Sequence, residues 1–403
     1  MKLLLINQVF WPDVAATAQH LTDLACELIN QGHEVTVLCA RRGYTEPHSI
    51  FAKKEIYQGI HIVRVWPFSL GRKYKILRVL DSLILNFAFA LRLARLGHFE
   101  RILVLTSPPL VGGVAGFFAK LWRKPLILWM MDVNPDEAIE AGWIRRNSLE
   151  AHMLESALRW VLNQSQKIIV LDRFMRDRIL LKGADPNKVK VIAPWSHDEA
   201  IQLIPHRDNP FRKKNNLDGK FVVMYSGNLS ICHPLNTLLE AAFLLKEEPT
   251  ISFVFIGGGQ RTQDILQARK ERSLSNVFYF PYQPRTEIKY SLSAADLHTV
   301  VMGEPYVGIV HPCKIYGILR LGRPFIYIGP QQSAPGELME ALKTGARVDH
   351  GEAERLAGLI LKMKNLSEAE KMEIQKINQA LAQQFSGHEI CAGLAREITG
   401  KLN

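Results

Sequence analysis

The stretch KLLLINQVFWPDVAATAQHLTDLACELINQGHEVTVLCA, residues 2–40, decides the fold class. It begins with a short apolar run (2–7) and ends with another (33–40), and between them residues 16–32 have the apolar spacing of a helix that ends at Gly32. Glycine is common just after a helix because it adopts the left-handed conformation without steric cost. Short, continuous apolar strands joined by a helix are typical of parallel sheets that are covered on both faces. The stretch therefore predicts the first β-α-β unit of a doubly wound α/β domain.

The same alternation continues along the chain and is interrupted once. Residues 206–217 are polar, charged and broken by Pro210, and the strand pattern restarts at FVVMYSG. We therefore predict an α/β fold with two doubly wound, Rossmann-like domains facing a central cleft. The first domain spans 1–205, a linker spans 206–217, and the second domain spans 218–384. Paired domains of this kind usually bind a ligand between them, at the carboxyl ends of their strands.

Composition and cysteine usage indicate an ordinary globular protein of the cytoplasm. Hydrophobic residues make up 47% and charged residues 22% of the 403 residues, which is typical of soluble domains. Five cysteines without a Cys-x-x-Cys pair favour reduced thiols and no structural zinc site. The first residues lack the cleavage site of a signal peptide.

The formal net charge of +11 is concentrated near one long apolar helix, over residues 72–95. Arg72 and Lys73 lie at its start, and Arg92 and Arg95 lie at its end. Asp81 is among the polar residues that interrupt its apolar run, so it is not expected to span a bilayer. Two interpretations stay open: a core helix with solvated ends, or a helix lying on the anionic inner surface of the membrane. Nucleic acid is not favoured as a partner, because no recognition motif accompanies the charge.

Candidate binding residues lie in the turns that follow predicted strands. No Gly-x-Gly-x-x-Gly follows the first strand and no Walker loop is present, which argues against a nicotinamide or ATP-hydrolysing enzyme. Small residues at a helix start and glycine turns can bring backbone N–H groups close to an anion. Each of these turns also has an ordinary structural interpretation, as a helix start, a buried histidine or a flexible loop. The candidates are Ala16 and Thr17; Gly227, Asn228 and His233; Gly257 and Gly258; and Tyr282 and Gln283.

The stretch GIVHPCKIYGILRLGRP, residues 308–324, places a lysine where a helix is expected to begin. It is typical of a strand end, a short turn and a helix. The helix dipole disfavours a cation at this end, unless an anion lies in front of it. Lys314 is therefore either a phosphate-binding residue, with His311 close enough in sequence to help, or a solvated lysine at the edge of a helix.

The motifs and their order resemble those of a known family. Residues 10–40, the segment LTSPPLVGGVAGFFAKLWRKPLILWMMDVNPDEAIEAG, and YSGNLS, VFIGGG, YQP and HPCKIYGILRLGRP carry the resemblance. They are similar to retaining glycosyltransferases of family 4, which have the two-domain GT-B fold, and in particular to bacterial enzymes of surface polysaccharide assembly. The resemblance covers nearly the whole chain. It also implies that a C-terminal helix, residues 385–403, packs back on the first domain.

What the resemblance implies is transfer of a hexosyl or N-acetylhexosaminyl group with retention. The donor would be a nucleotide-diphosphate sugar, and a UDP-sugar is the expected one. The acceptor would be a hydroxyl of a lipid-linked or polysaccharide-precursor glycan. No cofactor or metal is implied. Asp132 and Lys314 would be the catalytic residues, and Asp13 and Glu137 the acceptor-side candidates. The donor-binding residues would be Ala16, Thr17, Gly227, Asn228, His233, Gly257, Gly258, Tyr282, Gln283, His311, Pro312, Cys313, Lys314 and Tyr316.

The sequence departs from the family at four positions. Two family glutamates correspond to Ile309 and Gly317, and the arginine and lysine that clamp the diphosphate correspond to Asn228 and His233. Lys314 would then supply the charge that the absent clamp residues would have given. Two alternatives remain: a sugar-nucleotide epimerase of the same fold, or a catalytically weakened binding or scaffold partner in polysaccharide assembly.

Overall fold

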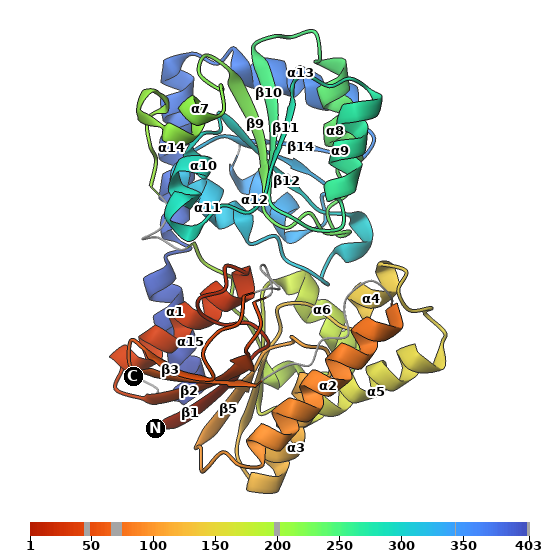
Figure 1. Cartoon of the computed structure of the whole chain (residues 1–403), viewed down its shortest axis with the longest axis vertical. Helices are drawn as coiled ribbons and strands as arrows, with labels where there is room; N and C mark the ends of the chain where they lie inside the picture. The colour runs from red at the N-terminus through yellow and green to blue at the C-terminus, as the bar shows by residue number, and fades with distance from the viewer. Residues whose placement is uncertain (44–48, 66–74, 197–201, 343, 401–403) are drawn as a thin grey trace. The chain divides into compact units, whose positions relative to one another are not determined.

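The computed structural model describes residues 1–43, 49–65, 75–196, 202–342 and 344–400, and the chain divides into two compact units (Figure 1). Unit 1 contains Met1–Pro194, Gly308–His311 and Gly387–Asn403, and unit 2 contains Trp195–Val307 and Pro312–Ser386. Each unit has its own largely parallel sheet with helices between the strands. The predicted fold class is confirmed.

In the described part of unit 1, eight strands form one sheet in the order β3-β4-β2-β1-β5-β6-β7-β8. All neighbours are parallel except β3 and β4. The two apolar runs of the opening stretch pair as predicted, with Leu3 opposite Val35. The strand order reverses between β1 and β5, which is where doubly wound sheets bind ligands. The strands are β1 (Lys2–Ile6), β2 (Glu34–Ala40), β3 (Lys54–Tyr57), β4 (Ile60–Val65), β5 (Arg101–Val104), β6 (Leu126–Trp129), β7 (Lys167–Val170) and β8 (Val189–Val191).

Two groups of helices cover the sheet of unit 1 (Figure 1). In one group α1 (Ala16–Asn30) packs on α15 (Gly387–Thr399), and in the other α3 (Val111–Trp122) packs on both α2 (Lys75–Leu93) and α5 (Leu149–Gln164). The C-terminal helix α15 is also tied to the strands of unit 1, because Arg101 Nη1 donates to the Ile398 carbonyl at 2.8 Å. The remaining helices are α4 (Asp136–Glu140), α6 (Arg173–Leu181) and the 3-10 helix η1 (Pro186–Lys188).

In the described part of unit 2, six parallel strands form a sheet in the order β11-β10-β9-β12-β13-β14. The order reverses between β9 and β12, the second such switch point in the chain. The strands are β9 (Phe221–Ser226), β10 (Ile251–Ile256), β11 (Val277–Phe280), β12 (Leu297–Val301), β13 (Phe325–Ile328) and β14 (Ala346–Val348). The helices are η2 (His206–Asp208), α7 (Pro210–Lys214), α8 (Asn236–Leu244), α9 (Thr262–Glu271), η3 (Arg285–Glu287), α10 (Ile288–Ser293), η4 (Glu304–Tyr306), α11 (Lys314–Leu321), α12 (Ala334–Leu342), α13 (Ala353–Lys364) and α14 (Glu368–Gln383).

The predicted linker, residues 206–217, is instead part of unit 2, which begins at Trp195 rather than after residue 205. These residues form η2 and α7. Arg212 is 2% exposed, and its guanidinium donates to the carbonyls of Ala294 and Leu217 and to the Asp296 carboxylate. A buried arginine is acceptable here because both of its Nη groups find partners. The polar composition that suggested a linker therefore belongs to a packed segment.

The segment Gly308–His311 is not the end of a strand, as predicted, but a short irregular segment of unit 1. Within the described residues, this segment forms one isolated antiparallel β-bridge, between Val310 and Asp132. The Val133 N–H donates to the Ile309 carbonyl at 2.9 Å. Gly308, at φ +69°, has no room for a side chain, because an added Cβ would lie 2.5 Å from the Phe174 carbonyl oxygen.

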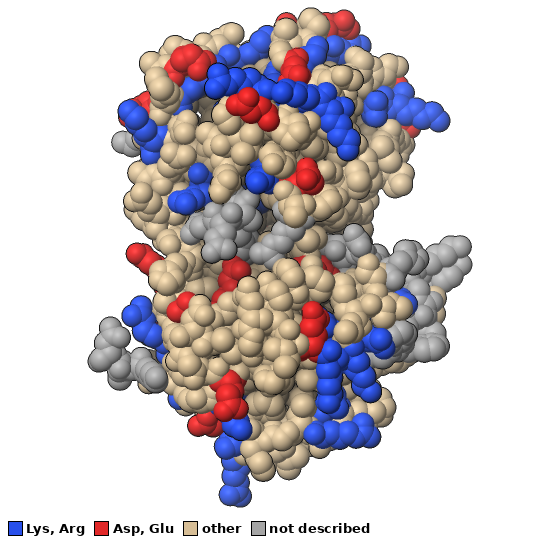
Figure 2. Space-filling view, turned by 60° about the vertical axis from the view of Figure 1, so that its left-hand side comes forward, with Lys and Arg blue, Asp and Glu red and all other residues tan. Residues whose placement is uncertain are grey.

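The long basic helix of the sequence is α2, over Lys75–Leu93. Arg72 and Lys73 lie outside the described residues. Among the helices of the described chain, none combines the length and hydropathy needed to cross a bilayer. On the face drawn in Figure 2, Lys and Arg side chains stand in separate groups with Asp and Glu between them.

Candidate functional site

Two glycine turns lie side by side at the carboxyl ends of β9 and β10 in unit 2. Gly257, at φ +137°, contacts the first turn so closely that an added Cβ would lie 2.0 Å from the Gly227 carbonyl oxygen. Gly259, at φ +148°, meets the Leu229 carbonyl in the same way, at 2.5 Å. Only glycine combines this backbone conformation with so close an approach. The glycines therefore join the two turns into one rigid edge beside the switch point.

Lys314, the first residue of α11, extends over this edge. Its Nζ lies 3.5 Å from the centroid of the Tyr225 ring, and an added Cβ on Gly227 would lie 3.1 Å from the same Nζ. The Nζ is buried and has no hydrogen-bond partner among the described residues. Burial lowers the pKa of Lys314 to about 7, because removal from water disfavours the charged form. We call Lys314, Tyr225, Gly227 and His233 the lysine cluster.

His233 belongs to the lysine cluster but cannot serve as predicted. Its Nδ1 lies 2.6 Å from the Val301 carbonyl oxygen, which can only accept, so Nδ1 carries the proton. Burial and the nearby Lys314 lower the pKa of His233 to about 3, so the ring is neutral at pH 7. Its Nε2 is then an acceptor and cannot donate to a phosphate. The expectation that His233 is a donor-binding residue is therefore corrected in one respect, because in this tautomer its ring cannot donate a hydrogen bond to the phosphates of the sugar donor.

The other residues of unit 2 that were predicted to bind the sugar donor are not part of the lysine cluster. Tyr282 is 39% exposed and its hydroxyl donates to the Gly258 carbonyl at 3.1 Å, while Gln283 Nε2 donates to the Pro281 carbonyl. The Asn228 side chain is exposed. Tyr316 is 4% exposed, and its ring packs on Phe385 with centroids 4.6 Å apart. Pro312 and Cys313 precede α11, and Gly317 lies within it.

In unit 1, Asp132 lies in the loop after β6 and forms a second cluster. Asn134 Nδ2 donates to Asp132 Oδ1 at 3.1 Å, and the Thr106 hydroxyl also hydrogen-bonds this carboxyl. Burial raises the pKa of Asp132 above its usual range, and the two hydrogen bonds oppose that shift in part. We call Asp132, Thr106 and Asn134 the carboxylate cluster. It offers a carboxyl group that can orient a hydroxyl.

The remaining predicted residues of unit 1 have local roles in the structure. Asp13 is 7% exposed, and its Oδ1 accepts from the Ala15 N–H just before α1, the helix that Ala16 and Thr17 begin. Glu137 lies in α4 and is half-buried. His311 is in unit 1, where its Nδ1 donates to Asp172 Oδ2 at 2.7 Å. Unit 1 therefore contains His311, Ala16 and Thr17, whereas unit 2 contains the lysine cluster.

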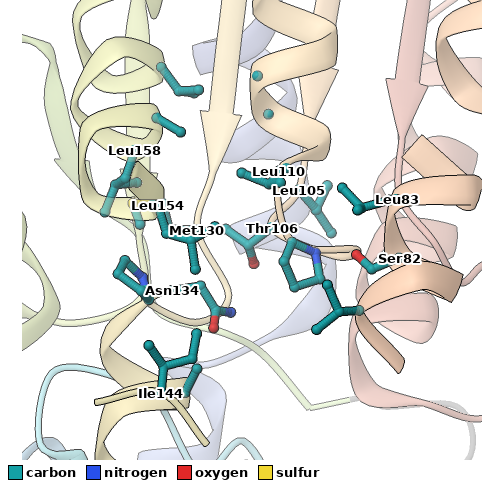
Figure 3. Close-up of a pocket in the computed structure, with 18 of the residues that line it drawn as sticks. Ser82, Leu83, Leu105, Thr106, Leu110, Met130, Asn134, Ile144, Leu154 and Leu158 are labelled. Carbon is teal, nitrogen blue, oxygen red and sulfur yellow. The ribbon is translucent and has the colours of Figure 1, made fainter. Parts of the chain in front are cut away.

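An apolar cavity of about 300 Å³ lies beside the carboxylate cluster, within unit 1 (Figure 3). Leu83 of α2 faces it from one side and Leu154 and Leu158 of α5 from the other, with Met130 and Leu105 at the strand ends. Thr106 and Asn134 bring polar atoms to its wall. No local sequence pattern predicts this cavity, because its lining comes from segments far apart in the chain.

Tyr225, Thr106 and Asn134 were also missed as site residues. Each lies at or just beyond the end of a predicted strand, in YSGN, VLTS and MMDVNP. Their positions were a usable signal, but their side chains are common in buried turns. No group of three or more His, Cys, Asp or Glu side chains in the described chain is arranged to hold a metal ion.

Both halves of the chain match models of one family. Residues 16–195 match "Glycosyl transferase 4-like domain" and residues 207–379 match "Glycosyl transferases group 1". WcaI of Escherichia coli K12, whose name assigns it to colanic acid biosynthesis as a glycosyl transferase, is 24% identical over 84% of this chain and 86% of its own. WbjE of Pseudomonas aeruginosa, described as a glycosyltransferase, is 24% identical over 64% of this chain, and the match spans 62% of WbjE.

Solved structures share the architecture of the whole chain. HepE of Anabaena in complex with UDP and glucose has a TM-score of 0.72 at 17% identity, with each chain fully covered. WaaG, a glycosyltransferase involved in lipopolysaccharide biosynthesis, has a TM-score of 0.73 at 14% identity over 99% of this chain and 100% of WaaG. At these identities the likeness is one of fold, the two-domain GT-B architecture.

Proposed function

This chain belongs to the group 1 glycosyltransferases, the retaining family 4 with the GT-B fold and nucleotide-sugar donors, and we propose that it transfers a sugar from a UDP-sugar to a lipid-linked acceptor hydroxyl. The donor part is supported by HepE, whose solved complexes contain UDP-glucose or UDP with glucose. The acceptor part is supported by the names of WcaI and WaaG, which place those proteins in surface polysaccharide biosynthesis.

The observation that carries the proposal is the buried Lys314 Nζ. It lies next to the glycine edge, beside the switch point of unit 2, and has no hydrogen-bond partner in the described chain. A buried ammonium group without a partner is unfavourable, and a diphosphate would supply the missing partner. A charge-assisted hydrogen bond of this kind contributes about 1.5–3 kcal/mol. The charge would also stabilise the diphosphate as it leaves, in an environment of low polarity.

Asp132 has the second role in the proposed reaction. The acceptor oxygen forms a bond to the anomeric carbon, and the bond from that carbon to the diphosphate breaks. UDP departs with the electron pair, and the hydroxyl proton passes to its phosphate oxygen. The carboxylate cluster would orient the acceptor hydroxyl, since Thr106 and Asn134 hold the Asp132 carboxyl in place. Orientation of this kind lowers the barrier without any new charge.

A donor panel tests the proposal. Thermal unfolding is measured with UDP-glucose, UDP-N-acetylglucosamine, GDP-mannose and ADP-glucose, since a ligand at 100 times its Kd stabilises by about 2.7 kcal/mol. We expect UDP-sugars alone to raise the melting temperature, and sugar transfer to require a lipid-linked acceptor. Free isomerised sugar nucleotide without an acceptor would indicate the epimerase. Binding of no nucleotide sugar would indicate the scaffold partner.

We also propose that unit 1 binds an anionic membrane surface through the helices α2, α3 and α5. These helices and the turn before α3 carry more than half of the exposed large hydrophobic side chains of the described chain. They are Val79, Leu80, Leu83, Phe87, Leu91, Leu110, Phe117, Leu121, Leu149 and Met153. Arg95, Lys120 and Arg123 are exposed nearby in sequence. An apolar surface with adjacent cations is typical of proteins that lie on anionic membranes.

A further inference from the structure

The apolar cavity of unit 1 opens onto an apolar surface. Val79, Leu83 and Leu110 line the cavity and are also 50%, 48% and 36% exposed. The cavity therefore reaches solvent between α2 and the turn that precedes α3. Beyond this opening the same layer of helices exposes Phe87 and Phe117, at 64% and 58%. A hydrocarbon chain that entered the cavity through this opening would contact apolar side chains both outside and inside the cavity.

The inner wall has a polar part that leads to the carboxylate cluster. Thr106 and Asn134 line the cavity (Figure 3). Both also hydrogen-bond the Asp132 carboxyl. Apart from Ser82, the rest of the wall is apolar. A volume of about 300 Å³ lies at the lower end of ligand pockets. The cavity thus suits a slender apolar ligand whose polar end lies near Asp132.

We propose that this cavity binds the hydrocarbon chain of the lipid-linked acceptor, so that unit 1 recognises the acceptor by its lipid as well as by its hydroxyl. The inference rests on the proposed function for the identity of the lipid. A soluble ligand would gain nothing from the exposed apolar side chains around the opening, whereas a lipid leaving a bilayer would. The polar atoms of Thr106 and Asn134 place the head group of the lipid, and not its tail, beside Asp132.

Two substitutions fill the cavity without breaking its helices. Gly113 of α3 lines the cavity, and a Cβ added to it meets nothing within 4 Å. Leucine is also a better helix former than glycine, so Gly113→Leu is expected to fold. Ala157→Phe fills the cavity from α5 on the opposite wall. Gly358→Leu is the matched control, because Gly358 is a helical glycine of α13 in unit 2 with nothing within 4 Å of an added Cβ.

Chain binding is measured directly with 12-bromododecanol, whose bromine quenches tryptophan fluorescence. Trp143 lines the cavity and is the reporter. We expect saturable quenching that is lost in Trp143→Phe and weakened at least tenfold in Gly113→Leu and Ala157→Phe. Gly358→Leu should behave as the wild type. Equal quenching of the wild type and both filled variants would overturn the site.

Transfer kinetics then identify the occupant. Two acceptors with one head group are compared, one with a four-carbon chain and one with a long prenyl chain. Burial of each methylene improves affinity by roughly fourfold, so the long chain should have the lower KM at similar kcat. Gly113→Leu should raise only that KM, and leave the KM of the UDP-sugar and the short acceptor unchanged. Chain-independent KM values would overturn the inference while the proposed function stands.

The remaining outcomes separate the two proposals. Saturable quenching without any transfer would contradict the proposed function and leave the chain site in place. The last measurement is the quenching of Trp143 by vesicles of phosphatidylglycerol with brominated acyl chains. If they quench Trp143 as strongly as the long acceptor does, and filling the cavity abolishes that quenching, the occupant is a membrane acyl chain and the assignment to the acceptor is wrong.

Discussion

Donor binding should be accompanied by uptake of a proton at Lys314. Burial lowers the pKa of Lys314 in the free protein to about 7. At pH 8 only about a tenth of the molecules then carry the charge at this position. Burial depresses this pKa by desolvation, whereas a diphosphate within hydrogen-bond distance raises it, because the negative charge and the hydrogen bond favour the ammonium form. We therefore expect uptake of about 0.9 proton per UDP-glucose bound at pH 8.

Isothermal titration calorimetry in buffers of different ionisation enthalpy measures this uptake. UDP-glucose is the donor of choice, because its phosphates do not titrate between pH 7 and 9 and so contribute no protons. The affinity for UDP-glucose should fall as the pH rises. Lys314 is mostly neutral above its pKa of about 7, so protonating it for donor binding costs free energy there. The Kd for UDP-glucose should therefore rise by up to about tenfold per pH unit above pH 7.

Two variants isolate the lysine. Lys314→Arg keeps a charge that cannot be lost near neutral pH, so binding should remain and proton uptake should vanish. Lys314→Met keeps the length of the chain without charge, and should both weaken binding and abolish uptake. Tight binding of UDP-glucose by the wild type with no uptake at pH 8 would refute the reasoning, since Lys314 would then either be charged already or lie away from the donor.

Three further predictions follow from individual contacts. Gly257→Ala should lower the free energy of unfolding, measured in urea, by about 3–5 kcal/mol, because its Cβ would lie 2.0 Å from the Gly227 carbonyl oxygen. Gly358→Ala is the control, because an added Cβ there lies in open space, and it should change the free energy of unfolding by less than about 1 kcal/mol. Equal effects of the two substitutions would contradict the close packing of the two turns. Asp132→Asn should lower kcat for transfer at least tenfold without changing the Kd for UDP-glucose, and full turnover would leave Asp132 a structural role only. Phe87→Ser should reduce sedimentation with phosphatidylglycerol vesicles, and wild-type binding should weaken as salt rises; equal binding to neutral phosphatidylcholine vesicles would remove the electrostatic part.

The doubly wound fold could be predicted because its signals are local. The central strands of the first unit, such as β1, β5 and β6, are short apolar runs, and a buried parallel strand needs nothing more to be recognised. The packed structure of residues 206–217, which were predicted to be a linker, could not be predicted from local signals. Arg212 is charged, and no local pattern states that Ala294 and Leu217 will supply carbonyls to its guanidinium. Likewise nothing in GIVHP indicates that Val310 will pair with Asp132, more than 170 residues earlier in the chain.

The sequence indicated positions for the candidate site but could not indicate protonation states. It pointed to strand ends, because side chains there meet at one edge of a sheet, and the roles of these residues stay predictions. What His233 can donate was decided by the Val301 carbonyl, which accepts the hydrogen bond from its Nδ1–H. What Lys314 can do was decided by the Tyr225 ring and the Gly227 turn. The two outcomes are connected. A protonated His233 beside Lys314 would place two cations in one apolar cluster. Burial and the nearby Lys314 keep His233 neutral, although the hydrogen bond to the Val301 carbonyl opposes them in part. Lys314 is therefore the sole titrating cation of the described lysine cluster. In the proposed reaction an arriving diphosphate would therefore meet one charge that its own presence switches on. Permanently charged side chains, which the family resemblance leads one to expect where Asn228 and His233 stand, would not behave in this way.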